Sequence, residues 1–260
     1  MMDWTDQHCR YFHRLISSHA VLYTEMISAD ALLFGPREKL LSFNKEELPC
    51  VLQLGGNNPD KLSKAAKYGQ DNGYSEINLN IGCPSNRVQN GSFGACLMET
   101  PKLVAECVKV IQENCQIPVT IKCRIGIDDM DEIKGLDDFV DEVSLLGTKL
   151  FIIHARKALL NGLSPKQNRE IPSLNYPRVG SLKKRRPDLK TFYERNFQMV
   201  RKFIRNIKYL FLRTEHIRLL EEENTALQRA LVESIDLVAD YKRAIQEMQR
   251  MISMIYKENL

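Results

Sequence analysis

The stretch Asn78–Met98, "NLNIGCPSNRVQNGSFGACLM", joins a short apolar run to a segment rich in glycine. Cys83 stands between a glycine and a proline directly after the run, and Gly91 and Gly94 follow within a dozen residues. Glycine allows a close approach between the backbone and a neighbouring group, because it carries no Cβ. The stretch therefore predicts a strand whose carboxyl end carries a cysteine in a closely packed loop.

Similar apolar runs recur on both sides of this stretch. They cover residues 21–26, 50–54, 76–80, 119–124 and 150–154. Amphipathic stretches of helical length, such as 59–72 and 101–114, lie between them. Because the apolar runs are continuous, we expect both faces of the sheet to be covered. The alternation predicts an α/β fold with a parallel sheet and crossover helices, either a barrel or a doubly wound sheet.

The predicted strands end in polar or reactive side chains, which are Glu25, Gln53, Asn80, Lys122 with Arg124, and His154 with Arg156. In parallel α/β folds the ligand lies at the carboxyl ends of the strands, and in (β/α) barrels catalytic groups come from several strand ends. A single residue of this kind is often only a hydrogen-bonded rim residue. Five such strand ends together favour a functional site.

The composition limits the class of protein. No run of 18 apolar residues occurs, and the N-terminus "MMDWTDQHCR" has acidic residues and no apolar core of a signal peptide, so we expect no membrane contact and a cytoplasmic location. The seven cysteines are odd in number and form no CxxC pair. They are expected to be reduced thiols, and no metal site is predicted.

Charge and periodicity both change after the last predicted strand. Residues 178–213 carry 12 Lys and Arg against 2 Asp and Glu, whereas residues 1–177 carry 19 against 22. Such a basic block attracts polyanions, RNA first among them, although it can also be the solvated face of a helix. From Ile217 to Ile255, apolar residues recur every three or four positions without glycine or proline. This pattern predicts a coiled coil or a helical bundle, and a homodimer through residues 217–255 is one outcome.

The chain is therefore divided into three predicted segments. Residues 1–179 form a partial (β/α) barrel, residues 180–213 a basic helical connector, and residues 214–260 a heptad-repeat helix. The fold class is α/β, an incomplete TIM-type barrel followed by an all-α coiled-coil or helical-bundle segment. A single helix packed against the half barrel is the alternative for the last segment.

Two segments, "EINLNIGCPSNRVQNGSFGACLM" (76–98) and "HARKALLNGLSPKQNR" (154–169), combine many residue types at fixed spacing. On these segments, residues 1–189 resemble the flavin-dependent tRNA-dihydrouridine synthases, and the A-type enzymes in particular. The resemblance implies reduction of the C5=C6 bond of a D-loop uridine in tRNA. It also implies FMN as cofactor, NADPH as reductant and a cysteine as general acid.

The resemblance assigns roles to residues that match the family's motifs. Cys83 matches the cysteine that protonates C5, and a thiol with an ordinary pKa near 8.5 is suited to donate a proton at neutral pH. The flavin-contacting positions are Gln53, Lys122 and His154. Substrate-binding positions are Asn80, which would also orient the Cys83 loop, and the arginines Arg87, Arg124 and Arg156.

Departures from the family pattern lead to two hypotheses. The family continues beyond residue 190 with two glycine-rich strand ends that hold the FMN phosphate, whereas Gly180 is the last glycine here, so that phosphate site is expected to be missing. Most of the first barrel strand is also expected to be missing. With about five of the eight strands of such a barrel, strand 150–154 would be an exposed edge. The chain is then either a tRNA-dihydrouridine synthase, or a catalytically inactive synthase remnant fused to a coiled-coil self-association module.

Overall fold

The computed structural model describes residues 5–193 and 246–249. The chain divides into two compact units, Met1–Tyr11 with Ala20–Glu194, and Phe12–His19 with Arg195–Leu260. The first unit contains most of the described residues. The predicted heptad-repeat helix and most of the predicted basic connector lie outside the described residues, apart from residues 246–249, which are helical.

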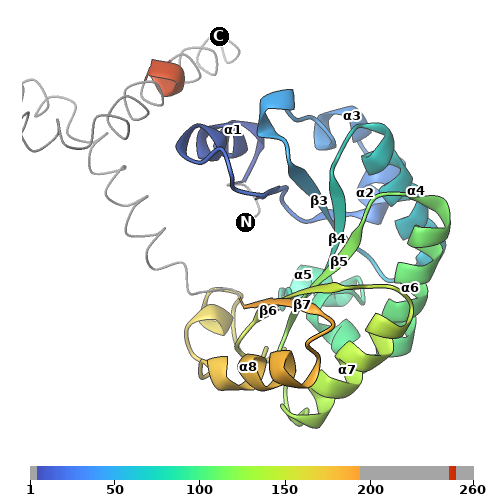
Figure 1. Cartoon of the computed structure of the whole chain (residues 1–260), viewed down its shortest axis with the longest axis vertical. Helices are drawn as coiled ribbons and strands as arrows, with labels where there is room; N and C mark the ends of the chain where they lie inside the picture. Colours follow the sequence, from blue (N-terminus) through green and yellow to red (C-terminus); the bar gives the residue numbers. More distant parts are fainter. Residues whose placement is uncertain (1–4, 194–245, 250–260) are drawn as a thin grey trace, which may run out of the picture. The chain divides into compact units, whose positions relative to one another are not determined.

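One parallel sheet forms the centre of the first unit (Figure 1). Every strand pair in it is parallel, and the strand order follows the chain. The strands are β1 (Leu22–Tyr23), β2 (Ile27–Ser28), β3 (Cys50–Gly55), β4 (Glu76–Ile81), β5 (Val119–Arg124), β6 (Leu150–His154) and β7 (Lys190–Tyr193). A doubly wound sheet would reverse its strand order, so this arrangement is that of an incomplete (β/α) barrel.

Helices connect successive strands and lie outside the curled sheet, where α4 packs against α6 and α6 against α7 (Figure 1). Asn58 accepts a hydrogen bond from the backbone N–H of Lys61 at the start of α4, and Asn175 caps α8 in the same way. The α-helices are α1 (Gln7–Ile16), α2 (Ala29–Phe34), α3 (Arg37–Leu40), α4 (Pro59–Asp71), α5 (Asn86–Asn90), α6 (Pro101–Asn114), α7 (Lys134–Leu145) and α8 (Tyr176–Arg185). Short 3₁₀ turns are η1 (Lys45–Glu47), η2 (Gly94–Glu99) and η3 (Gln167–Arg169).

The two faces of the sheet differ in chemistry. The outer face, against the helices, is apolar and buried, with Leu52, Leu54, Ile77, Leu79, Ile121, Cys123, Phe151 and Ile153. The register pairs Gln53 with Asn78, Asn80 with Lys122, and Arg124 with His154. Side chains of paired residues share a face, so these polar residues form the inner face. The strands are therefore not continuously apolar, in contrast to the sequence prediction, because polar residues occupy inner-face positions. The expectation that both faces are covered stays a prediction.

Most predicted elements occur where the sequence placed them. Strands 119–124 and 150–154 and helix 101–114 have the predicted bounds, whereas 21–26 contains only the two-residue strand β1, and β2 begins just after it. The prediction that 150–154 is an exposed edge was wrong, because β7 pairs with β6 along it. The predicted boundary at residue 179 falls inside α8, and β7 follows within the predicted connector, so the sheet extends further along the chain than expected.

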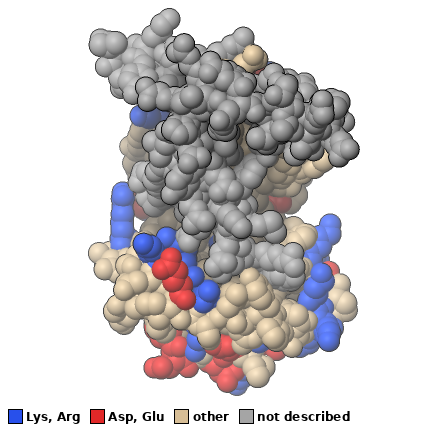
Figure 2. Space-filling view, turned by 90° about the vertical axis from the view of Figure 1, so that its left-hand side faces the viewer, with Lys and Arg blue, Asp and Glu red and all other residues tan. Residues whose placement is uncertain are grey.

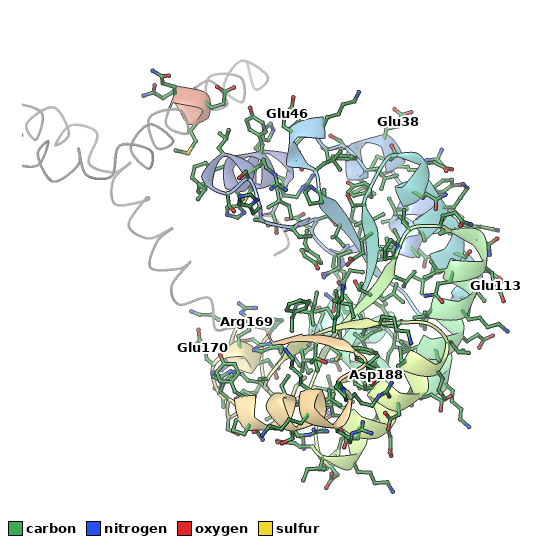
Figure 3. All side chains as sticks on the ribbon, in the orientation of Figure 1. Glu38, Glu46, Glu113, Arg169, Glu170 and Asp188 are labelled. Atoms are coloured by element: carbon green, nitrogen blue, oxygen red, sulfur yellow. The ribbon has the colours of Figure 1, made fainter. Side chains whose placement is uncertain are left out.

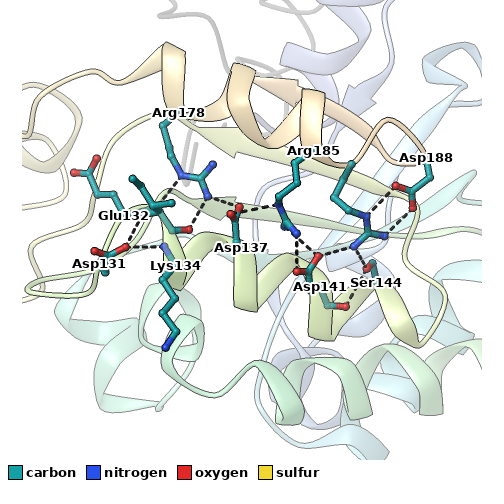
Figure 4. A network of polar contacts seen from close by, with 11 residues as sticks. Asp131, Glu132, Lys134, Asp137, Asp141, Ser144, Arg178, Arg185 and Asp188 are labelled. Atoms are coloured by element: carbon teal, nitrogen blue, oxygen red, sulfur yellow. Dashed lines mark hydrogen bonds and ion pairs between the residues drawn. The ribbon is translucent and has the colours of Figure 1, made fainter.

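Charged side chains join α7 to α8 (Figure 4). Arg178 donates to the backbone oxygen of Glu132 at 2.7 Å and also contacts the Asp137 carboxylate. Arg185 contacts Asp141 at 2.8 Å. Arg186 also contacts acidic side chains. Three arginines of the predicted basic block, Arg178, Arg185 and Arg186, therefore have acidic partners.

Arg186 contacts Asp141 at 2.6 Å and Asp188 at 2.7 Å. Its hydrogen bond lowers the pKa of Asp188 to about 2. On the face that Figure 2 shows, acidic and basic side chains accordingly lie beside one another. In residues 178–193 the basic block therefore stabilises helix packing, while Lys183 and Lys184 remain exposed.

No helix in residues 5–193 or 246–249 has both the length and the apolar character needed to cross a bilayer.

A buried ion pair ties the start of α1 to the segment before β3. Arg10 Nε lies 2.6 Å from Glu47 Oε2, and the two side chains are 5% and 0% exposed. Arg10 also donates to the backbone oxygens of Thr5 and Ser42, and Glu47 accepts from the N–H of Asn44. All three guanidinium nitrogens of Arg10 and both carboxylate oxygens of Glu47 thus have partners, which offsets the cost of burying the two charges.

We expect Arg10→Ala to lower the free energy of unfolding by about 3–5 kcal/mol, because it leaves the Glu47 carboxylate buried without its cation. Lys61→Ala is the matched control, since the Lys61–Asp30 pair is 44% and 63% exposed and should contribute less than about 1 kcal/mol. Urea unfolding followed by circular dichroism measures both. Equal small losses would contradict the role of the buried pair.

Candidate active site

Cys83 lies in a turn directly after β4, and the turn is held at several points. The N–H groups of Gly82 and Cys83 both donate to Asn80 Oδ1 at 3.0 Å. The carbonyl oxygen of Cys83 accepts from the N–H of Ala95 at 3.0 Å, and its Sγ lies 3.5 Å from Ser85 Oγ. The thiol is half-buried and stands at the carboxyl end of the sheet.

The other cysteines lie in different surroundings. All seven are free thiols. Burial raises the pKa of both Cys107 and Cys123 to about 12, and it also raises the pKa of Cys96. A thiol with such a high pKa is a poor proton donor near neutrality.

Among residues 5–193 and 246–249, no group of three or more His, Cys, Asp or Glu is arranged to hold a metal ion.

Gln53 and Asn80 contact each other on the inner face. Asn80 Nδ2 donates to Gln53 Oε1 at 2.8 Å, and Gln53 Nε2 donates to Asn78 Oδ1 at 2.9 Å. The backbone N–H of Gln53 donates to Thr24 Oγ1 at 2.9 Å. The two predicted residues are therefore parts of one hydrogen-bonded group, and through Asn80 that group reaches the backbone of the Cys83 turn.

Lys122 and His154 continue this face across the next two strands. Lys122 is the register partner of Asn80, and His154 is the register partner of Arg124. Both side chains are half-buried. Four adjacent strands, β3 to β6, thus each bring at least one predicted polar residue to the same face near their carboxyl ends. Amide, ammonium and imidazole groups in such a row can bind a flat ligand with oxygen and nitrogen atoms at its edges.

Arg124 has partners within the protein. It is 3% exposed and donates to the backbone oxygens of Gly82, Lys157 and Asn168, each at 2.9 Å. One guanidinium therefore connects the Cys83 turn to the loop after β6. A planar group with five donors is suited to such a junction. The contact of Arg124 with substrate stays a prediction, whereas its hydrogen bonds give it a positioning role.

Arg156 is likewise directed into the protein. It is 9% exposed and donates to the backbone oxygens of Glu170 and Pro172. These bonds hold the loop after β6, in which Figure 3 labels Arg169 and Glu170. Arg87, by contrast, is exposed on α5, a few residues after Cys83. Of the three predicted substrate-binding arginines, Arg87 is the one whose side chain faces solvent.

The loop after β6 contains residues that the sequence prediction missed. Asn168 is fully buried, and its side chain accepts from the N–H of Leu159 and donates to the oxygen of the same residue, both at 2.8 Å. Gln89 donates to the oxygens of Pro84 at 2.9 Å and Leu160 at 3.0 Å. The loop is therefore fastened to the segment that carries Cys83. The signal in the sequence was the segment "HARKALLNGLSPKQNR" (154–169), which contains Asn168, although only His154 and Arg156 within it were assigned roles.

Comparison with known proteins gives consistent matches. The chain matches the model of the family described as "Dihydrouridine synthase (Dus)" over residues 1–191. It is 59% identical over 184 residues to the tRNA-dihydrouridine(20/20a) synthase of Vibrio parahaemolyticus, and the alignment covers 70% of this chain and 56% of that protein. Synthases of the same name from Shewanella oneidensis and Escherichia coli K12 are 57% and 56% identical, and each aligns with 73% of this chain. The alignments cover 56% and 55% of those two proteins, so the chain spans about half the length of the curated relatives it matches.

Gly94 is the glycine on which the geometry of the turn depends most. Its φ is +78°, and a Cβ there would lie 2.6 Å from the Cys83 carbonyl oxygen and 2.5 Å from Val88 Cγ1. Both the backbone conformation and the close contact with Cys83 therefore exclude a side chain.

Gly94→Ala should lower the free energy of unfolding by about 2 kcal/mol or more, since it adds left-handed strain to the steric clash. Gly180→Ala in α8 is the control, because a Cβ there meets no heavy atom within 4 Å and should change stability by at most about 1 kcal/mol, in the stabilising direction. Chemical denaturation of the two variants compares them. A Gly94→Ala protein as stable as the wild type would show that the turn is not confined in this way.

Proposed function

Because the chain belongs to the dihydrouridine synthase family, we propose that it reduces a D-loop uridine of tRNA to dihydrouridine, with FMN as cofactor and NADPH as reductant. The observation that carries the proposal is the row of polar side chains on the inner face beside the Cys83 turn. The named relatives are tRNA-dihydrouridine(20/20a) synthases, which supports tRNA as the substrate class.

The residues of the inner face fit the ring system of FMN. Gln53, Lys122 and His154 lie on three strands of one face and carry N–H groups, which match the oxygen and nitrogen acceptors at the edge of a flavin ring. When bound, FMN supplies the hydride for C6 of the base after its reduction by NADPH. Lys122 would stabilise negative charge at the ring edge, because an ammonium group in a partly desolvated site attracts developing charge strongly.

Cys83 would supply the proton for C5. Addition of one hydride at C6 and one proton at C5 balances the reduction of the double bond. The S–H group of a cysteine is a proton donor, so Cys83 can serve as the acid. Asn80 accepts hydrogen bonds from the two N–H groups of the turn, and it would thereby fix the position of Cys83 Sγ relative to the inner face.

Recognition of tRNA would involve the exposed surface around the Cys83 turn. The target base must leave its stack to reach a site on the inner face of a sheet. Arg87 is exposed on α5 and is suited to contact a phosphate of the displaced strand. Arg124 and Arg156 would contribute indirectly, because their hydrogen bonds to backbone oxygens hold the loops that border the thiol.

The second candidate is a catalytically inactive synthase remnant that self-associates through a coiled coil. The observation that favours it is the glycine distribution, since the last glycine of the chain is Gly180 and a phosphate loop of the expected type requires glycines. The homodimer predicted through residues 217–255 lies outside the described residues and stays a prediction. A purified chain that folds but lacks reductase activity with FMN and NADPH present would favour this candidate.

We expect Cys83→Ala to slow dihydrouridine formation by at least about 100-fold, because general acid catalysis contributes a factor of this order. Cys96→Ala is the matched control, since the Cys96 thiol donates to the backbone oxygen of Phe93 and should be dispensable. The assay measures dihydrouridine in unmodified tRNA after incubation with FMN and NADPH. Equal rates for the wild type and Cys83→Ala would rule out the cysteine as the acid.

A further inference from the structure

A chain of polar side chains, three buried and two half-buried, runs across three strands and ends at the Cys83 turn. Asn78 Nδ2 donates to Thr120 Oγ1 at 2.9 Å, and Thr120 Oγ1 donates to Glu76 Oε1 at 2.6 Å. Gln53 and Asn80 join at the other end, through the Gln53–Asn78 and Asn80–Gln53 hydrogen bonds. We name these five side chains the polar relay: Asn80, Gln53, Asn78, Thr120 and Glu76. The proposed reaction assigns a role only to the first two.

Both ends of the polar relay require the same direction of hydrogen bonding. At one end, the backbone N–H groups of Gly82 and Cys83 can only donate, so Asn80 must present its oxygen to them and its NH₂ group to Gln53. Each amide along the relay then has its oxygen toward the turn and its NH₂ group away from it. At the far end, the carboxylate of Glu76 can only accept when ionised, so it receives the Thr120 hydroxyl proton at 2.6 Å. The backbone oxygen of Ile77, 3.4 Å from Thr120 Oγ1, can also only accept, so it favours the same direction.

Burial makes this direction costly to change. Asn78 is 0% exposed, Thr120 is 2% exposed and Gln53 is 9% exposed. A buried amide turned the wrong way would place two donors or two acceptors against each other, and each unsatisfied buried group is unfavourable. Asn78 and Thr120 lie within their strands rather than at the carboxyl ends, so ligand binding does not explain their chemistry.

We propose that Glu76 and Thr120 are positioning residues, which act through the polar relay to fix Asn80 and hence the Cys83 turn. The Glu76 carboxylate accepts the Thr120 hydroxyl proton, which leaves the hydroxyl oxygen to accept from the Asn78 amide. The orientation of Asn78 then determines that of Gln53, and Gln53 determines that of Asn80 at the turn. Burial raises the pKa of Glu76, and the Thr120 hydrogen bond opposes this rise, so the same contact supports the ionised form. The inference rests on the proposed function only for the use of the thiol, not for the hydrogen-bonded path itself.

The test is the rate at which each cysteine reacts with iodoacetamide in the full chain, read by peptide mass spectrometry. Thr120→Val keeps the β-branched shape but removes the hydroxyl, whereas Thr120→Ser keeps the hydroxyl. We expect Thr120→Val to raise the Cys83 rate several-fold, because a looser turn exposes the half-buried thiol more often. Thr120→Ser should react at a rate close to that of the wild type. Cys107 is the internal control, since it is 2% exposed and distant in sequence from the turn.

A Cys83 rate that does not rise in Thr120→Val would overturn the proposal. A parallel rise at Cys83 and Cys107 would also overturn it, because that pattern reports general destabilisation. Glu76→Ala and Glu76→Gln form a second pair if Thr120→Val does not fold, and only the alanine variant, which removes the nearer acceptor of the Thr120 hydroxyl, should raise the Cys83 rate. The measurement needs neither FMN nor tRNA, so it remains decisive even if the chain proves to have no reductase activity.

Discussion

Burial of a polar group without a hydrogen-bond partner is unfavourable, and this constraint governs the inner face of the sheet. The outer face is apolar and is covered by α4, α6 and α7. The inner face carries amides, a hydroxyl and charged groups from β3 to β6, and its amides are joined into the polar relay. Because Asn80 of the relay accepts the hydrogen bonds of the Cys83 turn, the position of the thiol depends on the hydrogen bonding of the inner face.

The loops around the thiol obey the same constraint by means of arginine and asparagine. Arg124 gives donors to three carbonyl oxygens, and Asn168 pairs both its amide groups with the backbone of its own loop. Arg178 and Arg186 perform a comparable task between α7 and α8. Several residues of the motif "HARKALLNGLSPKQNR" therefore have a structural explanation that precedes any contact with a substrate.

The sequence was sufficient to predict the parallel sheet, most strand bounds and the row of polar strand ends, because hydrophobic runs and turn residues are local signals. The family resemblance, confirmed by the match over residues 1–191, assigned roles to individual residues. Neither predicted β7, because its four residues, three of which are strand formers, lie inside the basic stretch that the charge pattern assigned to a helical connector. The junction at Arg124 was equally hidden, since the partners of this arginine are backbone oxygens far away in sequence. The relay was hidden for the same reason, because Glu76, Asn78 and Thr120 look like ordinary strand residues until the register brings them together.

A flavin on the inner face beside Cys83 is the feature on which the proposed activity depends, and equilibrium binding of FMN measures it. The folded chain is titrated with FMN, and quenching of flavin fluorescence is followed for the wild type and for Lys122→Met, which removes the ammonium from the inner face while nearly preserving side-chain length. We predict saturable binding of one FMN per chain, with weaker binding by the Lys122→Met variant. A folded wild-type chain that does not bind FMN, or a variant that binds it equally well, would contradict this assignment of the inner face.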